Sequence, residues 1–313
     1  MNKPLAHFLF WLFGALCFTP WLSAPVAMLL GMVVAATTGV PVGIDTSAWV
    51  KRLLGIAIVA LGFGMQVDTA LQVTGDYLGL IVVSIVATLL AAWVLWHWLG
   101  LDAKTGVLIG SGTAICGGSA IAAVAPAIRA RNDQIAIAIG CVFTLNAVAL
   151  LVFPVLGRLF ELSPETFGVW AAVAIHDTSS VVGAAEAFHD DALITATTLK
   201  LARALWIIPL AFGAAWLYQR QQSVAERAVS KTSVPWFLVG YVISMLIATY
   251  LPQGEPIYSV LFSGGKLVLV FCLFLVGTHL TLAKIRQAAG KPMLLATLLW
   301  LFIAGGSLLW LLR

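Results

Sequence analysis

Two short runs of small and polar residues interrupt long apolar segments of this chain. They occupy residues 114–120 and 174–180, 60 residues apart. Each interrupts a stretch long enough to cross a bilayer, where backbone groups without helical partners survive only inside protein or beside a water-filled cavity. Paired broken helices are typical of secondary transporters, which hold their substrate at the breaks.

The composition predicts a membrane protein. The chain is 61% hydrophobic and only 10% charged, with a mean hydropathy of +1.03, whereas about a quarter of the residues of soluble proteins are charged. The alternating pattern of a membrane β-barrel is absent. We therefore expect an all-α, polytopic transmembrane helical bundle that forms a single domain over residues 1–313. The net charge of +4 is spread over loops and favours span orientation over a nucleic-acid-binding surface.

Eleven segments approach the roughly 20 apolar residues that a span needs. Residues 8–22 look like a signal peptide, but no clear cleavage site precedes a polar domain, so we expect a retained first span. The segments are 5–22, 24–40, 52–67, 77–99, 104–127, 134–157, 165–187, 191–218, 234–251, 257–281 and 292–312.

The loop charges orient these spans across the membrane. A cytoplasmic N-terminus and a periplasmic C-terminus satisfy the positive-inside rule along nearly the whole chain. Arg129 and Arg131 are the exception: either segment 104–127 does not cross completely, or these arginines have another role. The cations placed in the cytoplasm are Lys3, Lys51, Arg52, Lys104, Arg158, Arg220, Arg227, Lys231, Lys284, Arg286 and Lys291.

Two internal similarities suggest repeats. Residues 106–157 resemble 168–213, and residues 61–67 resemble 274–280. The segments of the second pair would run in opposite directions, as in an inverted repeat, whereas segments 104–127 and 165–187 would run in the same direction. The pairing of the repeats is therefore left open.

The first break contains Gly117 and Gly118, which allow the backbone to leave helical geometry. Ser119 is a candidate N-cap for a second half-helix that runs to Ile128. Free N–H groups at such a start, together with the helix dipole, favour an anion. The alternative is a face of small residues that serves helix packing.

The second break contains His176 and Asp177. Ionisable residues in mid-span are costly and usually functional, and the titration range of histidine suits a proton-coupled step. A structural role is also open, in which Asp177 caps a half-helix beginning at Thr178.

Lys200 and Arg203 lie three residues apart on one face of segment 191–218. They are too deep to reach the membrane surface, so they should face the protein interior. They form either a buried ion pair with Asp177 or Glu186, or the cationic wall of an anion site, where the planar fork of Arg203 suits a tetrahedral oxyanion.

Other polar residues have simpler interpretations. We expect Lys266 at the membrane interface, and Gln66 and His279 in hydrogen bonds between helices. The cysteines lack metal-ligand spacing and are expected in the core; they are Cys17, Cys116, Cys141 and Cys272.

The run 112–123, GTAICGGSAIAA, resembles the hallmark motif of the YeiH-type membrane proteins, a family of proposed sulfate exporters. Residues 174–182 and 200–209 are similar to its second and third signature stretches, and the resemblance covers essentially the full length. It implies the inverted repeats and crossing broken helices of the cation/proton antiporter and bile-acid symporter superfamily. Residues 178–180 depart from the family pattern, which places Gln or Glu after the histidine motif.

The predicted function is a secondary transporter that exports or exchanges a small anion, such as sulfate or sulfite, with H⁺ or Na⁺ as a coupling ion. No nucleotide-binding loop, cofactor, metal site, nucleic-acid partner or enzymatic activity is expected, and a homodimer is compatible with the prediction. A cation/proton antiporter with Asp177 as carrier is the alternative; an intramembrane enzyme that joins Cys116 to His176 is a third. The predicted substrate-binding residues are Thr113, Cys116, Gly117, Gly118, Ser119, His176, Asp177, Thr178, Ser179, Lys200 and Arg203.

Overall fold

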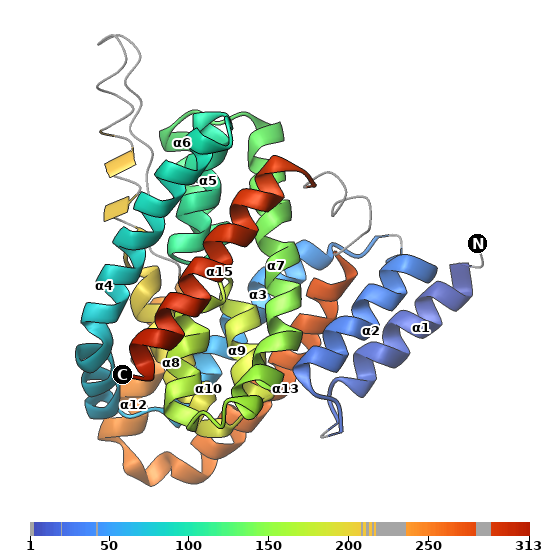
Figure 1. Cartoon of the computed structure of the whole chain (residues 1–313). Helices are drawn as coiled ribbons and strands as arrows, with labels where there is room; N and C mark the ends of the chain where they lie inside the picture. Colours follow the sequence, from blue (N-terminus) through green and yellow to red (C-terminus); the bar gives the residue numbers. More distant parts are fainter. Residues whose placement is uncertain are drawn as a thin grey trace.

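Helices form the whole regular structure of the residues that the computed structural model describes, which confirms the all-α prediction (Figure 1). Four helices are long and apolar enough to span a bilayer: α4 (Val67–Trp98), α7 (Asn132–Leu159), η3 with α13 (Pro252–Thr278) and α15 (Lys291–Leu311). The described residues are 3–19, 21–41, 43–207, 209–210, 213–214, 216, 236–279 and 289–313.

One side of the bundle is built around α13 (Glu255–Thr278). Helices α2 (Ala24–Thr37) and α3 (Thr46–Leu61) pack along it, with α1 (Lys3–Leu16) against α2 and α12 (Trp236–Tyr250) against α3. Gly31 and Gly277 bring α2 and α13 into backbone contact, since a Cβ on Gly31 would lie 2.0 Å from the Phe274 carbonyl oxygen.

The start of α3 meets the end of α13. His279 bonds through Nε2 to the Thr46 hydroxyl at 2.6 Å, which confirms the predicted role of this histidine between helices. The contact also shows that α3 and α13 are antiparallel, as the similarity of residues 61–67 and 274–280 predicted.

The other side contains the long helices α4, α7 and α15, with α10 (Asp190–Ala204) and four shorter helices between them. The shorter helices form two pairs, α5 (Ala103–Ala114) with α6 (Gly118–Ala127), and α8 (Pro164–Ala174) with α9 (Thr178–Glu186). Each of the four has 9 to 12 residues, or roughly 14–18 Å at 1.5 Å per residue. Each is therefore half the length of a span.

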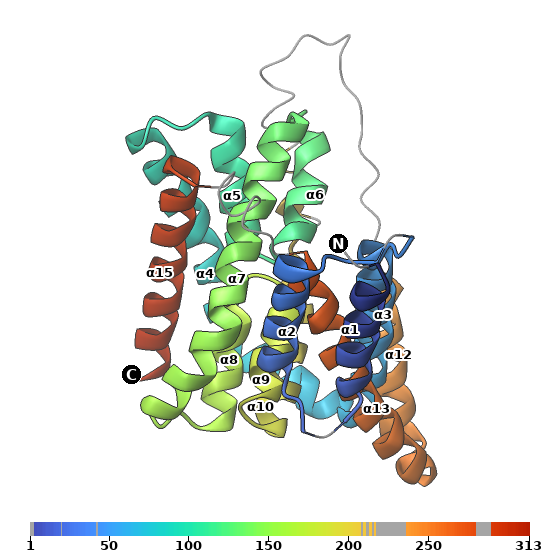
Figure 2. The same ribbon diagram turned by 90° about the vertical axis from the view of Figure 1, so that its right-hand side faces the viewer.

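Helices α5 and α6 form a hairpin that enters the bundle and returns to the same end. The ammonium of Lys104, at the start of α5, donates to the Arg129 carbonyl just after α6 at 2.9 Å. Figure 2 shows both helices in the upper half of the bundle. Segment 104–127 therefore does not cross completely, which was one of the two alternatives for Arg129 and Arg131, because 24 apolar residues also suffice for two half-spans.

Helices α8 and α9 form a second hairpin that enters from the opposite end. The rings of Phe167 and Phe188, near its two ends, stack with centroids 3.9 Å apart. Arg158, in the last turn of α7, donates to the Ala187 carbonyl just after α9. Segment 165–187 does not cross either, and Figure 2 shows this hairpin in the lower half.

The two hairpins enter the bundle from opposite ends, and each is followed by a longer helix that leads back into the bundle: α5–α6 by α7, and α8–α9 by α10. The similar segments 106–157 and 168–213 therefore run in opposite directions. Eleven full spans would have given them the same direction.

The hairpins also change the placement of the charges. Lys291 lies with Lys104 and Arg129, since its ammonium is 3.9 Å from the Cβ position of Gly100; we call this the cationic end. Arg158 lies at the opposite end, so its predicted place beside Lys104 is wrong.

At that opposite end, Asp190 pairs with Lys266 at 2.5 Å, and Glu165 accepts a hydrogen bond from Tyr77 at 3.0 Å. We call it the acidic end. The C-terminus lies there, away from α5 and α6 (Figure 1).

The hairpin topology predicts which residues share a side of the membrane. Single cysteines replacing Ala103 and Asn132 should react with a membrane-impermeant maleimide from one side, and those replacing Glu165 and His189 from the other. The native cysteines are no more than 2% exposed, so the unmodified protein is the background control. Labelling of positions 103 and 132 from opposite sides would show that segment 104–127 crosses the membrane completely and would contradict the hairpin.

Candidate functional site

The tips of the two hairpins meet inside the bundle. Helical structure stops at residues 115–117 in the first hairpin and 175–177 in the second. A Cβ on Gly117 would lie 3.6 Å from both the Cα and the backbone nitrogen of Asp177. Gly117 has a φ of +65°, which only glycine adopts readily. The two predicted breaks are therefore present, and they approach each other.

Lys200 holds the ends of α5 and α8 together. Its side chain is fully buried, and its three donors are all used. The Nζ atom donates to the carbonyl oxygens of Ile175 at 2.7 Å, Ile115 at 3.1 Å and Ala172 at 3.2 Å.

Arg203 makes the same kind of contact one turn further along α10. Its guanidinium is 1% exposed and donates from Nε and Nη2 to the Ala114 carbonyl, at 2.9 and 2.6 Å. A third bond runs from Nη1 to the Val173 carbonyl at 2.6 Å. Both cations therefore face the protein interior, as predicted.

The predicted ion pairs of these cations are not formed. Within the described residues, no carboxylate of Asp177 or Glu186 lies within 4.0 Å of Lys200 or Arg203. The last carbonyls of a helix have no intrahelical partner, and they carry the negative end of its dipole. The ends of α5 and α8 thus supply both the acceptors and the countercharge.

Asp177 caps the start of α9, as the structural interpretation predicted. Its Oδ2 accepts from the backbone nitrogens of Ser179 at 3.1 Å and Ser180 at 3.4 Å, and from the Ser179 hydroxyl. Asn146, from the middle of α7, accepts through Oδ1 from the backbone nitrogens of His176 at 3.1 Å and Asp177 at 3.3 Å. Protein groups therefore satisfy the start of the second half-helix.

The start of α6 has no such cap. Gly117 occupies the N-cap position and has no side chain that could cap the helix; the Cys116 sulfur interacts with the N–H group of Ala120. Ser119 lies inside the helix and is exposed, so the prediction that it is the N-cap is wrong; the break needs the positive φ that Gly117 provides. The N–H groups at the start of α6 are therefore open to a ligand.

Several buried polar atoms near the tips have no hydrogen-bond partner among the described residues. They are the Thr113 hydroxyl, the Asn146 amide nitrogen and both ring nitrogens of His176. These residues are at most 2% exposed. An unpaired buried polar group costs about 1–3 kcal/mol and calls for a bound ligand or water. Asn146 was missed by the sequence analysis, although a lone Asn in an apolar helix was a signal.

The other predicted residues also lie at the tips. Cys116 is 2% exposed and makes no hydrogen bond to His176, whose ring nitrogens bond nothing in the described part of the chain. Thr178 and Ser179 are buried in the first turn of α9, and Gly118 is partly exposed beside Phe143. The structure therefore brings all the predicted residues to one region.

The two tips differ in exposure. Residues 178–185 of α9 are all buried, and α9 packs against α2 and α13. In contrast, α6 exposes Ser119, Ala122 and Pro126 along one face. Lipid-facing helices such as α7 expose large apolar side chains like Val152 and Val155, but α6 exposes none. The exposed face of α6 therefore carries small residues only.

Comparisons with known proteins show the family. A family model described as "Conserved hypothetical protein 698" matches residues 5–296. A UPF0324 membrane protein of Photobacterium profundum is 50% identical over 300 residues, covering 96% of this chain and 90% of the relative. One from Vibrio vulnificus is 48% identical over 312 residues, covering 100% and 99%.

A UPF0324 membrane protein of Shewanella oneidensis is 48% identical over 297 residues, covering 95% of this chain and 92% of the relative. No solved structure matches the chain. The chain therefore belongs to the UPF0324 membrane protein family, which supports the resemblance to the YeiH-type proteins and a multi-pass membrane protein.

The carbonyl contacts predict that Lys200 is needed for stability. Lys200→Met should lower the free energy of unfolding by about 3 kcal/mol or more, because each buried carbonyl left unpaired costs about 1–3 kcal/mol. Lys266→Met is the matched control: it removes an ion pair at the protein surface, worth about 0–1 kcal/mol. Thermal unfolding in detergent compares the two; equal effects would contradict the capping role.

Proposed function

We propose that this UPF0324 family member is a secondary transporter that exports or exchanges a small anion across the bacterial inner membrane. The anion would bind at the uncapped start of α6, between the two hairpin tips. The observation that carries the proposal is the excess of positive charge and of unused donors at this place.

The charge balance favours an anion. The tips hold two buried cations, Lys200 and Arg203, and one carboxylate, Asp177, which gives +2 − 1 = +1. The unused groups include the first N–H groups of α6, the Thr113 hydroxyl and the Asn146 amide nitrogen. Donors arranged around a net positive charge suit an oxyanion.

The same contacts weigh against a cation/proton antiporter. A bound Na⁺ needs oxygen ligands, yet the carbonyls at the tips already accept from Lys200 and Arg203. One carboxylate oxygen of Asp177 caps α9. In effect, the two side-chain cations occupy the positions that a transported cation would need.

The charges of the two ends support an orientation. The positive-inside rule places the cationic end in the cytoplasm, and with it the exposed face of α6. The C-terminus is then periplasmic. The anion would enter from the cytoplasm, which suits export; a sulfur oxyanion is the substrate class implied by the family resemblance. An ion gradient or the substrate gradient would supply the energy.

Thr113 offers a specific test. Thr113→Val removes a hydroxyl that bonds nothing in the described protein, so stability should hold while anion affinity falls about tenfold, as expected for losing one hydrogen bond to a charged group. Transport of sulfate, sulfite and small sulfonates into proteoliposomes provides the measurement. Thr197→Val is the matched control, since its hydroxyl already bonds to the Leu193 carbonyl within its own helix. Unchanged transport in Thr113→Val would place the anion elsewhere.

Asp177→Asn separates the two transporter classes. In an anion transporter the amide oxygen can still cap α9, so anion binding should stay measurable with altered affinity. In an antiporter that uses this carboxylate as carrier, coupled transport should disappear. Proteoliposomes that carry a Na⁺ or pH gradient distinguish these results.

A further inference from the structure

A cavity lies at the acidic end, away from the hairpin tips. It has a volume of about 390 Å³. Its walls come from η1 (Gly62–Gly64) and the residues after it, from α10, and from α12, η3 (Pro252–Gly254) and the first turns of α13. None of the hairpin helices contributes to its lining, so it is independent of the proposed anion site.

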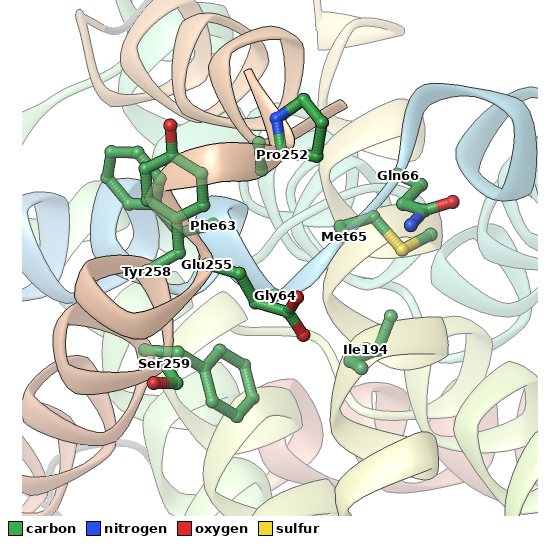
Figure 3. Close-up of a pocket in the computed structure, with 11 residues that line it drawn as sticks. Phe63, Gly64, Met65, Gln66, Ile194, Pro252, Glu255, Tyr258 and Ser259 are labelled. Atoms are coloured by element: carbon green, nitrogen blue, oxygen red, sulfur yellow. The ribbon is translucent and has the colours of Figure 1, made fainter. Parts of the chain in front are cut away.

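The cavity combines one carboxylate with aromatic rings. Glu255 projects into it between Tyr258 and Ile194 (Figure 3). Its carboxylate makes no hydrogen bond or ion pair with a described residue. Phe63 and Tyr258 stack beside it, with centroids 5.2 Å apart and planes 18° from parallel, and Phe262 forms a further wall.

This lining suits a cation with an apolar body. The faces of aromatic rings attract ammonium groups within about 6 Å, and an unpaired carboxylate repels anions. Among the described residues, no lysine or arginine lines the cavity. A metal ion would need several oxygen ligands, whereas Glu255 is the only carboxylate among the described residues of the wall.

The adjacent Lys266 shows that an ammonium group can lie beside these rings. Its ammonium lies 6.0 Å from the centroid of the Phe262 ring, but it pairs with Asp190 at 2.5 Å and does not line the cavity. An ammonium group therefore already occupies one position beside these rings, while Glu255 has no cation of its own.

We propose that this cavity binds an organic ammonium group, with its charge beside Glu255 and its alkyl groups against Phe63, Tyr258 and Phe262. Two sources share this chemistry: a soluble amine from the acidic side of the membrane, and the ammonium headgroup of a lipid such as phosphatidylethanolamine. Because the cavity lies between α10 and the helices around α13, the ligand would contact both sides of the bundle.

Binding of tetramethylammonium and choline to the purified full-length protein tests the proposal. Saturable binding is expected in detergent. Glu255→Gln should weaken it about threefold to fivefold, the size expected for the loss of one exposed ion contact. Asp76→Asn is the matched control, because this exposed carboxylate near the acidic end lies outside the cavity lining. Binding that is absent, or equally strong in Glu255→Gln, would overturn the proposal.

Nanodiscs separate the two sources. If a lipid headgroup is the ligand, phosphatidylethanolamine should raise the unfolding temperature of the unmodified protein but not of Glu255→Gln, and should block choline binding. If the ligand is soluble, choline should bind equally with and without this lipid. Retained anion transport in Glu255→Gln shows that the variant is folded. Because the two sites share no residue, loss of one activity leaves the other testable.

Discussion

Two half-helices that end inside a membrane leave carbonyl groups without partners, and the whole arrangement depends on how those groups are satisfied. Lys200 and Arg203 donate to carbonyls at the ends of both α5 and α8. A cation alone at mid-membrane would cost about 2.5–3.5 kcal/mol even on the lenient insertion scale. The carbonyls without the cations would stay unpaired. Together they fix α10 against both hairpins and hold the two tips in contact.

The two hairpin units differ in how their second half-helices begin. Asn146 and Arg203 occupy similar places, 146 − 132 = 14 and 203 − 190 = 13 residues from the starts of α7 and α10. Asn146 accepts from backbone N–H groups at the second tip, whereas Arg203 donates to carbonyls at both tips. Asp177 caps α9, but the matching place before α6 is Gly117. The uncapped donors of α6 therefore remain for a ligand.

Much of this site follows from the sequence. Glycines and a buried Asp-Thr-Ser-Ser run belong at helix starts, so the two breaks and the cap at Asp177 were predictable. The burial of Lys200 and Arg203 followed from the cost of exposing them to lipid.

The hairpins did not follow, because apolar length does not distinguish one full span from two half-spans. Arg129 and Arg131, on the wrong side of an eleven-span topology, were the available signal. The sequence also could not predict the hydrogen-bond partners of Lys200 and Arg203. These partners are backbone carbonyls, which become available only because two helices that are distant in the sequence end at the same place.

We propose that an anion binds to the start of α6 while Lys200 and Arg203 stay bound to the hairpin carbonyls. Anomalous diffraction from crystals soaked with selenate, a heavier analogue of sulfate, tests this directly. We expect a selenium peak within hydrogen-bond distance of the first N–H groups of α6, with the carbonyl contacts of Arg203 intact. A peak that contacts the Arg203 guanidinium in place of those carbonyls would contradict this binding mode.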